Sequence, residues 1–212
     1  AHAQRYNTLI KDGPSAYQHF ACQEAGLPAE NTAIMSTAAN MDVAATETMA
    51  WEDLEITAVV TAGVQGNATR AGDSARYHEK DGQWLPATPL PGTINILLLI
   101  NVPMQAGGLT QALITATEAK SSALQDLFVG SLASPTQATG TGTDQMIIAC
   151  PQEGSSRQSA GTHTRMGELI GKTVHRATMK ALEWQNGLSP SLSRNLSHLF
   201  KRLGFDQNEW QQ

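Results

Sequence analysis

The sequence is poor in the residues that build disulfide, metal and nucleic-acid sites. Its 212 residues include two cysteines, Cys22 and Cys150, which form neither a metal-ligating spacing nor a disulfide framework. This cysteine usage favours a reducing, cytoplasmic compartment. Fourteen Lys and Arg stand against nineteen Asp and Glu, for a formal net charge of −5. Without an excess of basic residues or a basic stripe, a nucleic-acid partner is not expected.

Long hydrophobic runs and the common catalytic motifs are also absent. The longest strongly apolar run, 94–102, is interrupted by Asn95 and Asn101 and is too short to cross a bilayer, so no membrane partner is expected. The sequence has no Walker loop, dinucleotide fingerprint, zinc spacing, Gly-x-Ser-x-Gly elbow or Cys/His pair. It therefore indicates no required cofactor and no resident metal site. The sequence does not determine the oligomeric state, and a homo-oligomer is compatible with it.

A loop of alternating threonine and glycine, 138–144, is the most informative feature that is present. It ends in Asp144 and runs directly into the apolar stretch 145–150. Glycine allows close backbone approach to a bound group, while the hydroxyls and the carboxylate supply hydrogen-bonding groups. Two further loops, 63–73 and 92–95, adjoin apolar runs in the same way. Since ligands of α/β proteins collect where strand-end loops converge, these three loops predict one site.

The pattern along the chain predicts an α/β fold, with a mixed sheet covered by helices in a single compact domain. A two-layer α+β arrangement is the alternative. The most strongly indicated strand, 94–102, is apolar enough to predict burial on both faces. Its succession with a helix and a further strand indicates a crossover. Strands are expected over 32–38, 56–62, 94–102 and 145–150, and helices over 14–25, 109–128, 162–185 and 191–203.

Three stretches are less clearly patterned. Residues 1–12 indicate a lead-in arm or an edge strand, and 44–54 is ambiguous, with a short helix as one interpretation. The polar stretch 72–91, punctuated by glycine and proline, indicates a surface excursion, with a hairpin as one interpretation. In the structural alternative for residues 162–163, Thr162 is the N-cap of the helix that follows and His163 a first-turn residue.

Several polar residues are candidates for chemistry, each with a structural alternative. Asp144 could orient a base, act as the base or bind a cation, or simply cap a turn. His163 could move protons near neutral pH, or be a first-turn helix residue. Glu118 could turn toward the site, although it and Lys120 also suit a solvent-facing helix surface.

The recognition residues are hydroxyls, amides and one charged pair. Arg70 and Asp73 could form a local ion pair or hold substrate amide or phosphate groups. The asparagines offer paired donors and acceptors suited to amide recognition. The candidate substrate-binding set is Gly63, Asn67, Arg70, Asp73, Thr93, Asn95, Gly140, Gly142 and Thr143.

Six motifs occur in a characteristic order along the chain: Thr-Ala-Gly-Val at 61–64, Arg-Ala-Gly-Asp at 70–73, Gly-Thr-Ile-Asn at 92–95, Thr-Ala-Thr-Glu-Ala-Lys at 115–120, the loop 138–144, and the segment 161–171. This ordered set resembles the adenosylcobinamide amidohydrolase family of corrinoid salvage. The resemblance implies a domain over 1–188, with 189–212 as a C-terminal helical extension. It also implies hydrolysis of the amide between aminopropanol and the corrin side chain, giving adenosylcobyric acid for cobamide salvage. The corrinoid, which carries cobalt, is then the small-molecule partner, and a corrinoid-binding protein without hydrolysis is the alternative.

Amide hydrolysis needs an activated nucleophile, an oxyanion stabiliser and an acid for the leaving amine. Chemistry alone favours water attack assisted by Asp144 or His163, with the backbone amides of 140–143 as oxyanion donors. A threonine nucleophile, Thr141 or Thr143, is the second route. A metal-assisted route is the third. The candidate catalytic residues are Asp144, His163, Glu118 and Thr141.

Overall fold

The chain divides by its internal contacts into two compact units, Ala1–Ser36 and Thr37–Gln212. The computed structural model describes residues 2–75, 78–80, 83–85 and 92–193. In the first unit, α1 (His2–Ala25) has a non-helical residue at Gly13, and η1 (Ala29–Asn31) follows. Gly26 has a φ of 68°, which confirms the predicted helix end. The predicted arm or edge strand over 1–12 is wrong, because the chain is helical from His2.

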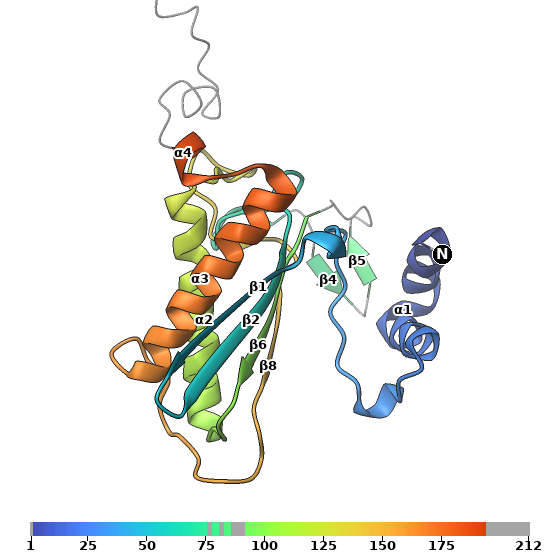
Figure 1. Cartoon of the computed structure of the whole chain (residues 1–212). Helices are drawn as coiled ribbons and strands as arrows, with labels where there is room; N and C mark the ends of the chain where they lie inside the picture. Colours follow the sequence, from blue (N-terminus) through green and yellow to red (C-terminus); the bar gives the residue numbers. More distant parts are fainter. Residues whose placement is uncertain (1, 76–77, 81–82, 86–91, 194–212) are drawn as a thin grey trace, which may run out of the picture. The chain divides into compact units, whose positions relative to one another are not determined.

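The second unit contains a four-stranded sheet in the order β1-β2-β6-β8 (Figure 1). Its strands are β1 (Ala45–Trp51), β2 (Leu54–Ala62), β6 (Ile94–Ile100) and β8 (Gln145–Ala149). The pairs β1–β2 and β2–β6 are antiparallel, whereas β6–β8 is parallel. The helix α2 (Ala106–Asp126) joins the parallel pair. The predicted α/β class, the mixed sheet and the crossover are therefore confirmed.

Short elements connect the main ones. The 3-10 turn η2 (Met41–Val43) precedes β1, and β3 (Ala68–Thr69) pairs with β7 (Gly140–Thr141). The strands β4 (His78–Lys80) and β5 (Gln83–Leu85) form the predicted hairpin in the polar excursion. The helices α3 (Arg165–Asn186) and α4 (Pro190–Ser193) complete the described chain. The rest of the helix predicted over 191–203 lies outside the described residues.

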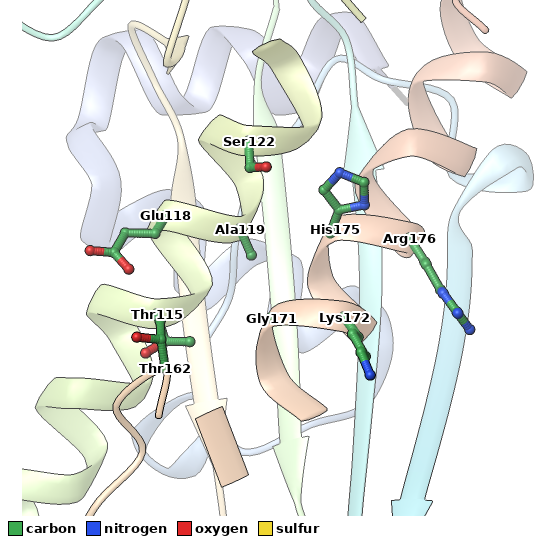
Figure 2. A pocket seen from close by; sticks show the side chains of 9 residues that line it. All are labelled: Thr115, Glu118, Ala119, Ser122, Thr162, Gly171, Lys172, His175 and Arg176. Atoms are coloured by element: carbon green, nitrogen blue, oxygen red, sulfur yellow. The ribbon is translucent and has the colours of Figure 1, made fainter. Parts of the chain in front are cut away.

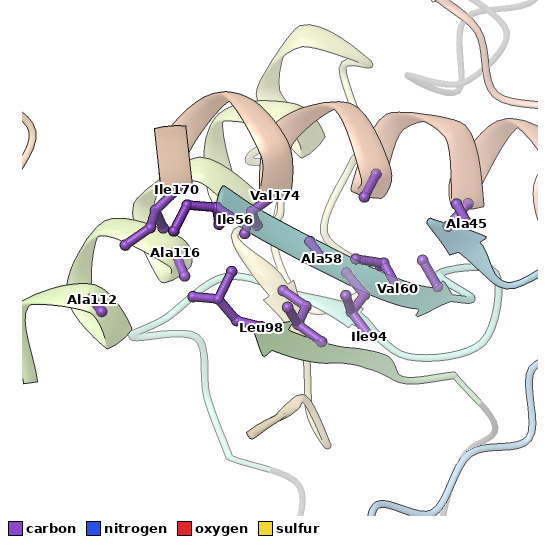
Figure 3. Close-up of a cluster of buried hydrophobic side chains, with 14 of the residues drawn as sticks. Ala45, Ile56, Ala58, Val60, Ile94, Leu98, Ala112, Ala116, Ile170 and Val174 are labelled. Carbon is purple, nitrogen blue, oxygen red and sulfur yellow. The ribbon is translucent and has the colours of Figure 1, made fainter. Parts of the chain in front are cut away.

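The core lies between the sheet and two helices that cover the same face of it (Figure 1). Alternate residues of β2 point into this layer, so Ile56, Ala58 and Val60 are fully buried. They meet Ile170 and Val174 from α3 (Figure 3). The buried face of α3 includes Leu169, Ile170, Val174, Ala177, Ala181 and Leu182. None of the helices among the described residues is long and apolar enough to span a membrane.

The structure corrects three expectations about the sheet. Residues 44–54 form β1 and its turn rather than a helix, because pairing with β2 outweighs local helix propensity. Residues 32–38 form no strand. The expected burial of 94–102 on both faces is wrong: Leu99 is 39% exposed on the face away from the helices.

The inner face of α2 combines small residues with one leucine. Ala112, Ala116 and Leu124 are fully buried, while Leu113 is 45% exposed. The small residues let α2 pack closely against its neighbours.

Candidate functional site

The three candidate loops meet at one end of the sheet, and Asn67 joins them. Its Nδ2 donates to the carbonyl oxygen of Gly92 at 3.2 Å and contacts Thr143 Oγ1 at 3.4 Å. The backbone oxygen of Asn67 accepts from Gly142 N at 3.2 Å. Thr143 Oγ1 also donates to Gly92 O at 2.8 Å and lies 2.7 Å from Thr93 Oγ1. Loops far apart in the sequence thus form one hydroxyl- and amide-rich surface.

Asp144 lies at the centre of this arrangement and accepts hydrogen bonds from three residues. Its Oδ1 accepts from Ile94 N at 3.0 Å and from Thr141 Oγ1 at 2.5 Å. Thr141 N contacts both carboxylate oxygens at 3.1 Å, and Oδ2 accepts from Lys120 Nζ. The carboxylate is therefore held in one orientation, with its charge balanced by a lysine.

Lys120 is the residue that sequence reasoning missed. The sequence predicts it on a solvent-facing surface, but it is 9% exposed and forms an ion pair with Asp144. A lysine this buried is rare unless paired. A signal was available: a lone lysine among Ala119, Ser121 and Ser122, small residues typical of a packed helix face.

Two glycines are needed where these groups crowd together. A Cβ on Gly140 would overlap Asp144 Oδ2 and lie 2.7 Å from Lys120 Nζ. Gly92 has a φ of 136°, and a Cβ there would lie 3.0 Å from the Cβ of Asn67. The alternation of glycine and threonine in the sequence thus reflects close approach as well as hydrogen bonding.

Asp73 lies on the same side, where hydroxyl and backbone donors bind its carboxylate in place of a side-chain ion pair with Arg70. Its Oδ2 accepts from Ser131 Oγ at 2.6 Å, from Thr69 Oγ1 at 3.3 Å and from the backbone amide of Arg70 at 2.9 Å. The hydrogen bond from Ser131, reinforced by Ser134 and the Arg70 amide, lowers the pKa of Asp73 from 3.8 to about 2. Asp73 accepts from the backbone amide of Arg70 and not from its guanidinium group. This hydrogen bond is therefore not the side-chain ion pair between Arg70 and Asp73 that the sequence left open.

His163 lies at the other end of β8. Asp144 immediately precedes this strand, whereas Arg165, two residues after His163, stacks on Trp51, which pairs with Leu54 at the opposite end of the sheet. A strand residue adds about 3.3 Å, so five residues separate the two ends by roughly 15 Å. Thr164, not Thr162, caps α3: its Oγ1 accepts from Gly167 N at 3.0 Å. His163 therefore precedes the cap rather than lying in the first turn, and no contact in the described residues links it to Asp144.

Glu118 is exposed and borders a different cavity. Figure 2 shows this cavity of about 340 Å³ between α2 and α3, lined by Glu118 and Ser122 on one side and by Lys172, His175 and Arg176 on the other. His175 is paired with Asp126, and Lys172 with Glu168. None of the residues that line this larger cavity belongs to the three candidate loops. The size of the cavity and the chemistry of the side chains therefore indicate different candidate sites. The convergent loops are the better candidate, because they bring reactive groups within bonding distance.

A smaller cavity, of about 140 Å³, adjoins the loops directly. It is lined by Ala38, Ala39, Gly63, Gln65, Gly66, Gly92, Gln185 and Asn186. Asn95, by contrast, is 5% exposed within β6, opposite Thr61 and Gln145 on the neighbouring strands. Among the described residues, no three His, Cys, Asp or Glu side chains gather into a group that could hold a metal ion.

The fold and this site define an α/β protein with a hydroxyl- and amide-rich strand-end site. A model of the adenosylcobinamide amidohydrolase family matches residues 2–190, so the chain belongs to that family. The chain is also 39% identical over 176 residues to an uncharacterized protein of Methanocaldococcus jannaschii, a match that covers 78% of this chain and 68% of that protein. No solved structure matches the present chain.

Proposed function

We propose that the protein hydrolyses the amide bond between aminopropanol and the corrin side chain of adenosylcobinamide, giving adenosylcobyric acid and the amino alcohol. Membership of the amidohydrolase family supports the reaction class. The observation that carries the proposal is the Thr141 hydroxyl, which donates to the lysine-paired carboxylate of Asp144 at 2.5 Å. An amide hydrolase needs a nucleophile whose proton has a base to go to, and this pair supplies both.

Of the two candidate threonines, Thr141 has the better partner. The hydroxyl of Thr143 donates to the carbonyl oxygen of Gly92, which is not a base at neutral pH. In the proposed reaction, Thr141 Oγ forms a bond to the amide carbon and its proton passes to Asp144. The carbon–nitrogen bond then breaks, and Asp144 returns the proton to the departing amine. Water, deprotonated by Asp144, cleaves the resulting ester, and the proton returns to Thr141.

Direct attack by water activated by Asp144 is the second route, and it suits the burial of Thr141. Thr141 is only 8% exposed, while the side chain of Asp144 is 17% exposed. In both routes Lys120 keeps the carboxylate oriented and compensates its charge.

The test is incubation with adenosylcobinamide and detection of adenosylcobyric acid by mass spectrometry. Asp144→Asn should lower turnover by at least about 100-fold, the scale of a lost acid or base. Thr141→Ala should do the same if Thr141 is the nucleophile, whereas wild-type turnover in Thr141→Ala favours direct attack by water. Thr117→Ala is the matched control, because its hydroxyl donates to Leu113 O within α2 and outside these loops. Corrinoid binding without product from the wild type would instead indicate a binding protein.

The pH dependence of turnover tests whether His163 takes part in proton transfer. Its distance from Asp144 along β8 leads us to expect that His163→Gln keeps the wild-type pH–rate profile between about pH 5 and 8, where an imidazole titrates. A pH–rate profile that flattens in this variant would show that His163 takes part in proton transfer. The reacting amide would then bind nearer to the other end of β8.

A further inference from the structure

The smaller cavity beside the convergent loops has an unusual lining. The residues that form it include three carboxamide side chains, Gln65, Gln185 and Asn186, and three glycines, and none of them is ionisable. A cavity of this size holds the volume of about four or five waters, each occupying about 30 Å³ in the liquid. It therefore admits one side arm of a ligand rather than a ring system.

Two of its carboxamides are held by backbone donors. Gln185 Oε1 accepts from Asn40 N at 3.0 Å, and Asn186 Oδ1 accepts from Val64 N at 3.2 Å. Because their oxygens are engaged, the NH₂ groups are the ends left to donate, and no residue in the described part of the chain accepts from them. The cavity thus offers fixed donors to an acceptor such as an amide carbonyl.

The ligand that suits this lining is neutral. Gln185 and Asn186 are the last two residues of α3, and the partial negative charge at a helix C-terminus disfavours an anion. No acidic side chain in the lining would compensate an ammonium group. A carboxamide carries both a carbonyl acceptor and an NH₂ donor without net charge, so it meets both conditions.

We infer that this cavity binds a non-reacting carboxamide arm of the corrin substrate, an inference that rests on the proposed function for the identity of that substrate. Gly92 links the cavity to the reacting loops, because it lines the cavity while its carbonyl oxygen accepts from Asn67 and Thr143. A corrin ring is fringed with amides, so one arm held here positions a neighbouring arm at Thr141 and Asp144. The cavity residues are specificity determinants rather than catalytic residues.

The test compares binding and turnover in two variants of the cavity lining. Gln185→Glu keeps the acceptor for Asn40 N but replaces the NH₂ donor with a charged oxygen. Gly63→Ala adds a methyl group at ordinary contact distance, 4.0 Å, from Ala39 and Gln185. Gln111→Glu is the matched control, since its Oε1 also accepts from a backbone amide, that of Ala160, but outside the cavity.

We expect Gln185→Glu, which loses about one hydrogen bond to the ligand, and Gly63→Ala, whose methyl group occupies part of the cavity, each to raise the Kd and KM for adenosylcobinamide about tenfold. The kcat should stay within about twofold, and Gln111→Glu should match the wild type. Should Gln185→Glu fail to fold, Gly63→Ala decides the question. An unchanged Kd in the folded variants overturns the inference while product formation leaves the proposed function standing. A wild type that binds without forming product refutes the proposed function, and the Kd comparison still decides the cavity. A wild type that does not bind adenosylcobinamide refutes both.

Discussion

At the scale of single residues, the crowding around Gly140 should make this position intolerant of any side chain. Gly140→Ala places a methyl group against Asp144, which three residues hold in place. We expect a loss of about 1–3 kcal/mol in the free energy of unfolding, the usual range for overpacking. Gly171→Ala, in the middle of α3 with nothing within 4 Å, is the control and should stabilise by up to about 1 kcal/mol. Urea denaturation of both variants measures the difference. Equal stabilities would show that the loop relaxes around the methyl group.

Asp73 should make the loop that carries it sensitive to acid. Its pKa falls from 3.8 to about 2 on folding, chiefly through the hydrogen bond from Ser131. A depressed carboxyl pKa contributes stability that is fully present above about pH 4 and is lost as the pH falls toward 2. Asp73→Asn should therefore be less stable than the wild type at neutral pH. The difference in stability should shrink as the pH falls through this window. Urea midpoints measured from pH 7 to pH 2 test this, and a constant difference at all pH values would contradict it.

At the scale of elements, the stability of α3 depends on the threonine whose hydroxyl accepts a hydrogen bond from a backbone amide in the first turn. Thr164 accepts from Gly167 N, whereas no hydrogen bond in the described part of the chain involves the Thr162 hydroxyl. Thr164→Ala should cost about 1 kcal/mol, the usual value of an N-cap. Thr162→Ala should stay within about 0.5 kcal/mol of the wild type. Thermal or chemical unfolding of the two alanine variants distinguishes them, and the reverse order would restore the cap predicted from the sequence.

At the scale of the whole molecule, the core belongs to one of the two units. Every residue of the main buried cluster lies between Ala45 and Leu182, and none of the side chains that the structure describes within Ala1–Ser36 belongs to it. A variant that lacks residues 1–36 should therefore keep a cooperative transition with a Tm within about 5 °C of the wild type, since 1 kcal/mol shifts Tm by a few degrees at this size. Ile170→Ala, at a fully buried position, should by contrast lose about 2–5 kcal/mol. Calorimetry measures both, and loss of the transition on deletion would show that the first unit is needed for folding.

Local chemistry in the sequence was sufficient for the class of fold and for the loops of the candidate site. The apolar runs at 56–62, 94–102 and 145–150 predicted three of the four sheet strands, because a buried strand needs a continuous or alternating apolar pattern whatever its partners. The glycine and threonine of 138–144 indicated a backbone that other groups approach closely, which agrees with the crowding at Gly140. The ordered motifs were also enough to indicate the family, which the match over 2–190 confirms.

Tertiary structure decided the features that depend on which surfaces meet. β1 is a strand because β2 lies beside it, not because of its own propensity. Lys120 is buried rather than exposed, and Glu118, two residues earlier, is exposed, because the loop that ends in Asp144 covers only one side of α2. The sequence offered Asp144 and His163 as candidates for the same proton transfer, without showing whether the two side chains lie near each other. Only the three-dimensional path of β8 assigns the loops to one end and His163 to the other.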